Sequence, residues 1–255
     1  MKQIPNILTL ANLFCGCMAI IFVLYAPETL TELNGVDYSV TNPAPVYWAS
    51  VFVVLAGVFD LFDGMVARML KVSSPVGKEL DSLADVVSFG VVPGMILFRI
   101  LRSAYMQQPD IFDVSYVNLA PALLVPCFAA YRLAKFNLDT RQSENFIGMP
   151  TPAVGLLVAS FPLIMLYDQY NVAHYLGNIW IIYAIIAVLC YLMVAEIPMI
   201  SMKFKKLKAK ENLPRFLVIA IVIVSIPVFK FLAVPIIFAS YVILSLVMPP
   251  KIEDA

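Results

Sequence analysis

Long apolar runs separated by short polar connections dominate the chain. Eight of them are expected to form membrane-spanning helices, at residues 7–25, 47–69, 84–104, 118–136, 152–168, 178–198, 215–229 and 232–248. A helix needs about 20 apolar residues to cross the hydrocarbon core of a bilayer. The last two runs are short and lie close together on either side of Lys230, so they are interpreted as a helical hairpin. The pattern therefore predicts an all-α, polytopic transmembrane helical bundle.

Composition agrees with this pattern and narrows the classes of protein. Hydrophobic residues make up 62% of the 255-residue chain and charged residues 13%, whereas soluble domains average about 45–50% and about 25%. The 17 basic and 17 acidic residues cancel, which excludes disordered acidic chains and nucleic-acid binders that rely on bulk positive charge. The first apolar run superficially resembles a signal peptide, but its length of about 19 residues predicts a span that is retained.

The distribution of basic residues predicts the orientation of the bundle. If the N-terminus is cytoplasmic and the spans alternate, all of the 17 basic residues fall on the cytoplasmic side except Arg99, Arg102 and Lys230. Membrane insertion produces this kind of bias, so we expect a multi-pass protein of the cell membrane. The expected organisation is a core at residues 1–200, a basic cytoplasmic linker at 201–214, and a C-terminal transmembrane hairpin and tail at 215–255.

Four carboxylates are concentrated where the second span ends and the third begins. Asp60 and Asp63 are three residues apart and Asp81 and Asp85 are four apart, so each pair lies on one face of its helix. The short loop at residues 73–77 predicts antiparallel neighbouring helices whose carboxylates face one another. One charge at the centre of a membrane helix costs about 2.5–3.5 kcal/mol, and four like charges repel unless cations neutralise them. We expect a site for two divalent cations, Mg²⁺ or Mn²⁺, suited to phosphoryl transfer.

Small residues and one arginine accompany the carboxylates. Gly64 and Gly77 have no Cβ, which allows the backbone to approach a ligand closely, and Ala67 is also small. Arg68 lies one turn from Gly64 on the same helix face, where its guanidinium is suited to binding a phosphate oxygen. A divalent-cation transporter is the less favoured alternative, because transport predicts charges deep in several spans, whereas these acids are gathered at one interface.

These residues match the signature of a known family. The pattern D-x-x-D-G-x-x-A-R, eight further residues, then G-x-x-x-D-x-x-x-D begins at Asp60 and ends at Asp85 without a departure. In this the chain resembles the CDP-alcohol phosphatidyltransferase family. Further similarity, to the integral-membrane phosphatidylserine synthases of that family, covers residues 5–12, 80–91, 130–137 and 146–152.

The resemblance implies a fold, a reaction and roles for residues. The implied fold is a six-helix membrane core with a cytoplasm-facing cavity, here extended by the C-terminal hairpin, and usually a homodimer. The implied reaction transfers the phosphatidyl group of CDP-diacylglycerol to the hydroxyl of L-serine and releases CMP. The implied metal ligands are Asp60, Asp63, Asp81 and Asp85. Asp85, as general base, and Asp81 are the implied catalytic residues. The implied CDP-binding residues are Asp63, Gly64, Ala67, Arg68, Gly77 and Asn6.

The acceptor requires a pocket of its own, because the carboxylate of serine needs a cation. Arg132 and Lys135 are three residues apart on one face at the expected cytoplasmic end of the fourth span. We expect them to form the serine pocket with Asn137, although basic residues there are equally typical of ordinary membrane anchoring. Glycerol-3-phosphate and an inositol are alternative acceptors, since enzymes that use them have the same family signature.

Overall fold

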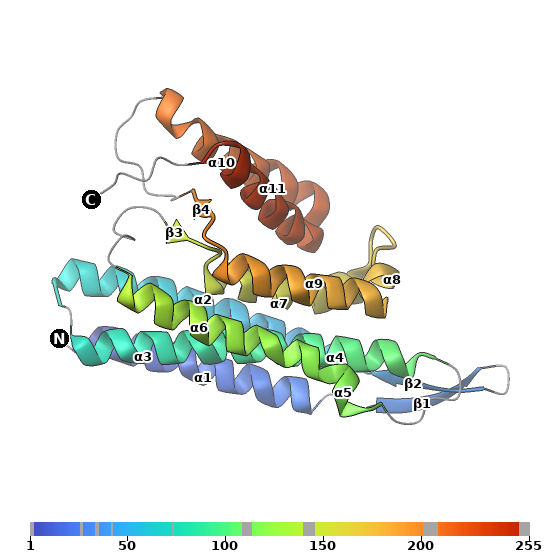
Figure 1. Ribbon diagram of the computed structural model, residues 1–255. Helices are drawn as coiled ribbons and strands as arrows, with labels where there is room; N and C mark the ends of the chain where they lie inside the picture. The colour runs from blue at the N-terminus through green and yellow to red at the C-terminus, as the bar shows by residue number, and fades with distance from the viewer. Residues whose placement is uncertain are drawn as a thin grey trace.

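The computed structural model describes residues 3–25, 28–33, 36–41, 43–72, 74–108, 114–139, 146–200 and 209–249. Long helices with roughly aligned axes form a bundle, so the predicted all-α membrane fold is confirmed (Figure 1). The bundle helices are α1 (Ile4–Leu24), α2 (Pro43–Leu70), α3 (Pro75–Val86), α4 (Val92–Met106), α6 (Leu124–Leu138), α7 (Thr151–Tyr167) and α9 (Ile179–Val194). Short helices lie in two connections, α5 (Tyr116–Leu119) and α8 (Ala173–Leu176).

Several of these segments have the length and hydropathy of membrane spans. In the described part of the chain, five helical segments are long and apolar enough to cross a membrane, namely 4–24, 45–70, 75–106, 116–138 and 212–247. The last of these comprises the two helices of the C-terminal hairpin described below. α7 and α9 are apolar but shorter, with 17 and 16 residues. Successive long helices run in alternating directions, so the start of α1, the turn from α2 to α3, and the ends of α6 and α9 lie at the same end of the bundle (Figure 1). This alternation agrees with the predicted spans.

The third span begins earlier than the apolar pattern predicts, at Pro75 instead of residue 84. Ser74 caps the helix, because its Oγ accepts a hydrogen bond of 2.9 Å from the Gly77 N–H, and Pro75 is suited to the first helical turn. The polar residues of the first turns conceal this start from a hydrophobicity pattern. A π-helical turn, Val87–Val91, then joins α3 to α4. One helical segment therefore leads from the polar end of the bundle into its core.

The core lies around the π-helical turn and α4. Phe89 and Ile96 are fully buried there, and two glycines allow neighbouring helices to approach the turn. A Cβ at Gly155 of α7 would lie 2.7 Å from the Phe89 ring. A Cβ at Gly16 of α1 would lie 2.5 Å from the Ser88 Oγ. α1 and α7 are thus held close to the turn that leads into α4.

Two short antiparallel strand pairs, absent from the sequence prediction, are formed by segments that connect helices. β1 (Glu28–Leu33) pairs with β2 (Val36–Thr41), from Glu28 opposite Thr41 to Leu33 opposite Val36. β3 (Phe146–Ile147) pairs with β4 (Pro198–Met199). The second pair joins the segment before α7 to the segment after α9, and Gly148 turns the chain into α7 with a φ of +77°.

The predicted C-terminal hairpin consists of α10 (Ala209–Phe229) and α11 (Ala233–Val247). The two helices double back on one another beside the rest of the bundle (Figure 1). Lys230, at the turn between them, has a left-handed φ of +49°. α10 begins within the segment expected to be a basic linker. Residues 201–208 of that linker, and 250–255 of the expected tail, lie outside the described residues.

Candidate active site

The four carboxylates singled out in the sequence lie together at one end of the bundle. Oxygen atoms of Asp60, Asp63 and Asp81 are all within 4.8 Å of one another. Asp85, one turn further along α3, is 7% exposed and interacts electrostatically with the other three. Oxygen donors of this kind suit a hard divalent cation, and the mutual repulsion of the carboxylates makes a bound cation more favourable.

The turn between α2 and α3 reverses the chain beside the carboxylates. Lys71 follows α2 with a left-handed φ of +52°, and the Val72 N–H donates a hydrogen bond of 3.0 Å to the Ala67 carbonyl. The two helices run antiparallel, as predicted, and their carboxylates face one another (Figure 1). Within the described residues the two helices share few contacts, and both pack on α1. The carboxylates therefore face one another across a space bordered by α1.

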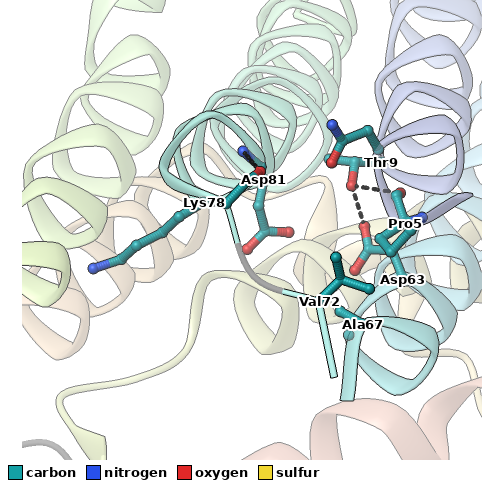
Figure 2. A pocket seen from close by; sticks show the side chains of 11 residues that line it. Pro5, Thr9, Asp63, Ala67, Val72, Lys78 and Asp81 are labelled. Carbon is teal, nitrogen blue, oxygen red and sulfur yellow. Dashed lines mark hydrogen bonds between the residues drawn. The ribbon is translucent and has the colours of Figure 1, made fainter. Parts of the chain in front are cut away.

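α1 contributes two buried polar side chains to the carboxylates. Thr9 Oγ1 donates a hydrogen bond of 2.7 Å to Asp63 Oδ2, and Asn12 Nδ2 donates one of 3.3 Å to Asp85 Oδ1. Figure 2 shows Thr9 and Asp63 turned toward one another. The sequence interpretation assigned no role to either α1 residue. A signal was present, because Asn6, Thr9 and Asn12 recur every three residues and so lie on one side of the helix.

A pocket of about 210 Å³ opens beside the carboxylates (Figure 2). Residues from α1, α2, α3 and the intervening turn line it: Pro5, Asn6, Thr9, Asp63, Gly64, Ala67, Val72, Ser74, Gly77, Lys78 and Asp81. Five of the six expected CDP-binding residues are in this lining. The sixth, Arg68, lies next to it, with its Nη1 3.6 Å from the position of a Cβ on Gly64. The sequence interpretation missed the contributions of Pro5, Thr9, Val72, Ser74 and Lys78.

Gly77 lies at a point of the pocket wall where a side chain does not fit. A Cβ there would lie 2.9 Å from Ser74 Oγ and 3.1 Å from Asn6 Oδ1. Those two polar atoms come from different helices, since Ser74 caps α3 and Asn6 belongs to α1. A glycine lets the backbone of α3 meet α1 without filling the pocket between them.

Arg132 of α6 lies in the interior next to the carboxylates. It is 7% exposed, its guanidinium lies 5.3 Å from the centre of the Phe136 ring, and its Nη1 is 3.5 Å from Thr151 Oγ1 at the start of α7. The carboxylate of Asp85 acts on it electrostatically. Its Nε has no hydrogen-bond partner among the described residues. A buried guanidinium with an unused donor is suited to binding an anionic group.

The other two residues expected in the serine pocket lie elsewhere on α6. Lys135 Nζ forms a partly exposed ion pair with Glu196 Oε1, at 3.0 Å. Asn137 Nδ2 donates a hydrogen bond of 2.8 Å to Ser82 Oγ, and its carbonyl accepts one of 3.2 Å from Lys78 Nζ. The structure thus brings Arg132 to the carboxylates, whereas Asn137 links α6 to α3 and Lys135 faces Glu196.

Comparison with known proteins identifies the group to which this site belongs. A sequence model described as CDP-alcohol phosphatidyltransferase matches residues 2–202. The chain belongs to the CDP-alcohol phosphatidyltransferase family. The resemblance found in its carboxylate signature is therefore confirmed, and the protein is a membrane-embedded transferase of this family.

Comparison with individual curated proteins gives relatives with more specific names. A Bacillus subtilis protein named CDP-diacylglycerol–serine O-phosphatidyltransferase is 32% identical over 171 residues, which cover 67% of this chain and 78% of the relative. A Helicobacter pylori protein of the same name is 32% identical over 221 residues, 85% of this chain and 78% of the relative. An archaetidylserine synthase of Methanothermobacter thermautotrophicus is 30% identical over 173 residues, 67% of this chain and 62% of the relative.

Proposed function

We propose that the protein transfers the phosphatidyl group of CDP-diacylglycerol to the hydroxyl of L-serine, forming phosphatidylserine and releasing CMP. The observation that carries this proposal is the four-carboxylate cluster beside a pocket lined by the family signature. The names of the bacterial relatives support serine as the acceptor. The site lies at an end of the membrane helices, so a lipid donor can present its headgroup there while its acyl chains stay in the bilayer.

Two divalent cations, Mg²⁺ or Mn²⁺, belong to this proposal. Asp60, Asp63 and Asp81 are the ligands that we assign to them, because their carboxylate oxygens are close enough to share a cation. Asp85 interacts with all three carboxylates and is an additional ligand candidate. Carboxylate oxygens are the donors that these hard ions prefer. When bound, the cations neutralise charge that develops on the diphosphate of the donor.

The protein's own residues bind the donor and move the proton. We assign CDP to the pocket, held by Asn6, Asp63, Gly64, Ala67, Arg68 and Gly77. Asp85 is the proposed general base, and Asp81 lies beside it on α3. Asn12 donates to Asp85 Oδ1, so we assign the transferred proton to Oδ2. As the serine oxygen bonds to the β-phosphorus, Asp85 accepts the hydroxyl proton, the bond from that phosphorus to the bridging oxygen breaks, and CMP leaves.

The carboxylate of serine is assigned to Arg132. Its burial, its unused Nε donor and its electrostatic interaction with Asp85 support this assignment. An acceptor bound there has its hydroxyl near the proposed base. Lys135 is engaged with Glu196 and Asn137 with Ser82, so we narrow the proposed serine pocket to Arg132.

The proposed reaction takes place at the cytoplasmic face of the cell membrane. The carboxylate cluster lies at the end of the bundle at which α1 begins (Figure 1), and the bias of basic residues favours a cytoplasmic position for that end. We also propose a homodimer, on the resemblance to the family. Chemical cross-linking in native membranes tests it: a band at twice the chain's mass is expected, and a monomer alone would contradict it.

Release of CMP by the purified protein in detergent micelles tests the proposed function. Reactions contain CDP-diacylglycerol, Mg²⁺ or Mn²⁺, and one acceptor at a time: L-serine, glycerol-3-phosphate or myo-inositol. We expect CMP and phosphatidylserine with serine, and neither product with the Asp81→Asn variant. Release with glycerol-3-phosphate or inositol alone would overturn the assignment of the acceptor. No release with any alcohol, together with Mn²⁺ uptake by proteoliposomes, would favour the transporter alternative.

A further inference from the structure

Two polar side chains of α1 are in direct contact with two of the four carboxylates. Thr9 and Asn12 are 4% and 0% exposed, so both are buried. Thr9 Oγ1 lies 2.7 Å from Asp63 Oδ2 on α2, and Asn12 Nδ2 lies 3.3 Å from Asp85 Oδ1 on α3. A single helix therefore contacts one carboxylate of each pair.

The Thr9 hydroxyl donates its proton preferentially to the Asp63 carboxylate. It has one proton and lies within hydrogen-bond distance of two acceptors, the Pro5 carbonyl at 3.1 Å and Asp63 Oδ2 at 2.7 Å (Figure 2). Hydrogen bonds to an ionised acceptor are shorter and about twice as strong as neutral ones. The shorter bond to Asp63 is therefore the favoured one, and it fixes one oxygen of that carboxylate toward α1.

The backbone on either side of Asn12 is held in place. The backbone carbonyl of Asn12 accepts a hydrogen bond of 3.2 Å from Ser88 Oγ, in the π-helical turn. One turn further along α1, Gly16 permits the close approach to Ser88 described above. Asn12 Oδ1 is buried without a hydrogen-bond partner among the described residues. The side chain therefore places its Nδ2 against Asp85 although its Oδ1 stays unsatisfied.

We propose that Thr9 and Asn12 are positioning residues of the active site: Thr9 orients Asp63 for cation binding and Asn12 orients Asp85 to accept the proton. These roles rest on the proposed function. They follow from the arrangement of the helices, because α2 and α3 share few contacts with one another and both pack on α1. α1 is thus placed to set the separation of the two carboxylate pairs, and these two side chains form its hydrogen bonds to them among the described residues.

The two roles have different experimental signatures. A hydrogen-bond partner of a metal ligand typically contributes about 10–100-fold to metal affinity. Loss of the Thr9 hydroxyl is expected to weaken cation binding, whereas loss of the Asn12 amide is expected to lower kcat. Thr9 also lines the pocket, so its effect on the cation must be measured without CDP-diacylglycerol.

Mn²⁺ binding by the purified protein tests the role of Thr9. Free Mn²⁺ is quantified by electron paramagnetic resonance during titration without donor lipid. Thr9→Val, which keeps the shape and removes the hydroxyl, is expected to raise the Mn²⁺ Kd about 10-fold or more, and Thr9→Ser to restore most of the affinity. Ser50→Ala is the matched control, because Ser50 is a buried residue whose hydroxyl donates to the Val46 carbonyl. Thr9→Ala replaces Thr9→Val if the latter does not fold.

Steady-state kinetics at saturating Mn²⁺ test the role of Asn12. Asn12→Leu is expected to lower kcat about 10-fold or more with little change in Mn²⁺ Kd, and Asn12→Asp, which adds a fifth carboxylate, to lower it further. If Thr9→Val and Asn12→Leu matched Ser50→Ala in Kd and kcat, the positioning roles would be refuted. If both variants had lower thermal stability and equal changes in Mn²⁺ Kd, kcat and KM, the two contacts would serve the stability of the fold, and the positioning roles would be refuted. If the wild-type protein itself neither bound Mn²⁺ nor released CMP, the proposed function would fail first.

Discussion

Replacement of Arg132 by alanine is the sharpest perturbation of the proposed acceptor site. Arg132 is 7% exposed, so its charge is little screened by water or salt. Its contact with Thr151, at 3.5 Å, is at the limit of hydrogen bonding, and Nε has no partner among the described residues. The substitution breaks no strong hydrogen bond within the protein, but it removes a buried charge that interacts with Asp85. Under the proposed assignment, its main consequence falls on the carboxylate of serine.

The magnitude follows from the burial of the guanidinium. Truncating one partner of a buried, hydrogen-bonded charge pair costs about 2–5 kcal/mol, which at about 1.4 kcal/mol per tenfold corresponds to about 30-fold or more. We expect kcat/KM for serine to fall by at least that factor, while KM for CDP-diacylglycerol changes little. Arg132→Lys keeps a charge but loses the planar fork, and its kcat/KM is expected to lie between those of the wild type and Arg132→Ala.

Lys135 provides a matched control on the same helix. Lys135→Met removes one positive charge a turn away from Arg132, but it breaks only a partly exposed ion pair with Glu196, of a kind worth about 0–1 kcal/mol. CMP release is measured for both variants, first with serine varied at a fixed concentration of CDP-diacylglycerol. It is then measured with CDP-diacylglycerol varied at a fixed concentration of serine. Equal effects of the two substitutions, or an unchanged serine KM in Arg132→Ala, would refute the assignment of the serine carboxylate to Arg132.

Four further results are expected. Asp85→Asn lowers kcat by about 10²–10⁴-fold because a general base is lost; CMP release at saturating substrate measures it, and near-normal turnover would remove Asp85 from that role. Chelation by EDTA abolishes CMP release and added Mg²⁺ or Mn²⁺ restores it, whereas activity in excess chelator would contradict the assigned cations. Gly77→Ala raises KM for CDP-diacylglycerol more than KM for serine, because its Cβ would lie 2.9 Å from Ser74 Oγ; equal changes in both constants would count against a CDP pocket. Gly16→Ala destabilises the fold by about 1–3 kcal/mol through overpacking in thermal denaturation, while Gly57→Ala, whose nearest neighbouring atom is 3.8 Å away, does not.

The carboxylate cluster could be predicted from sequence because its cause is local. Charges are scarce in this chain, and helical periodicity places residues three or four apart on one face. Asp60 and Asp63, and then Asp81 and Asp85, therefore had to form two pairs, and a short turn had to bring the pairs to one end of the bundle. The same reasoning predicts the apolar spans, since hydrophobicity over about 20 residues is a strong signal.

Packing between distant segments could not be predicted in this way. The packing of α1 against both α2 and α3 depends on contacts such as Gly16 with Ser88, 72 residues apart in the numbering, and no local pattern specifies that pair. Thr9 and Asn12 were consequently overlooked as partners of the carboxylates. The start of α3 at Pro75 was missed for a different reason: its first turns are polar, and the cap of Ser74 on Gly77, rather than hydrophobicity, determines where the helix begins.

The proposed donor and acceptor parts of the site are formed by different helices. The proposed donor half consists of α1, α2 and the first turns of α3, and its pocket lining includes Asp63, Gly64, Ala67, Gly77 and Asp81 of the family signature. The proposed acceptor half lies on α6 and α7, where Arg132 is 3.5 Å from Thr151. α6 is linked to α3 by the hydrogen bond from Asn137 to Ser82. Asp85 belongs to both halves, because it contacts Asn12 of α1 and interacts with Arg132. If the serine carboxylate binds Arg132 as proposed, a change of acceptor is expected to require substitutions around Arg132 and to leave the signature residues unchanged.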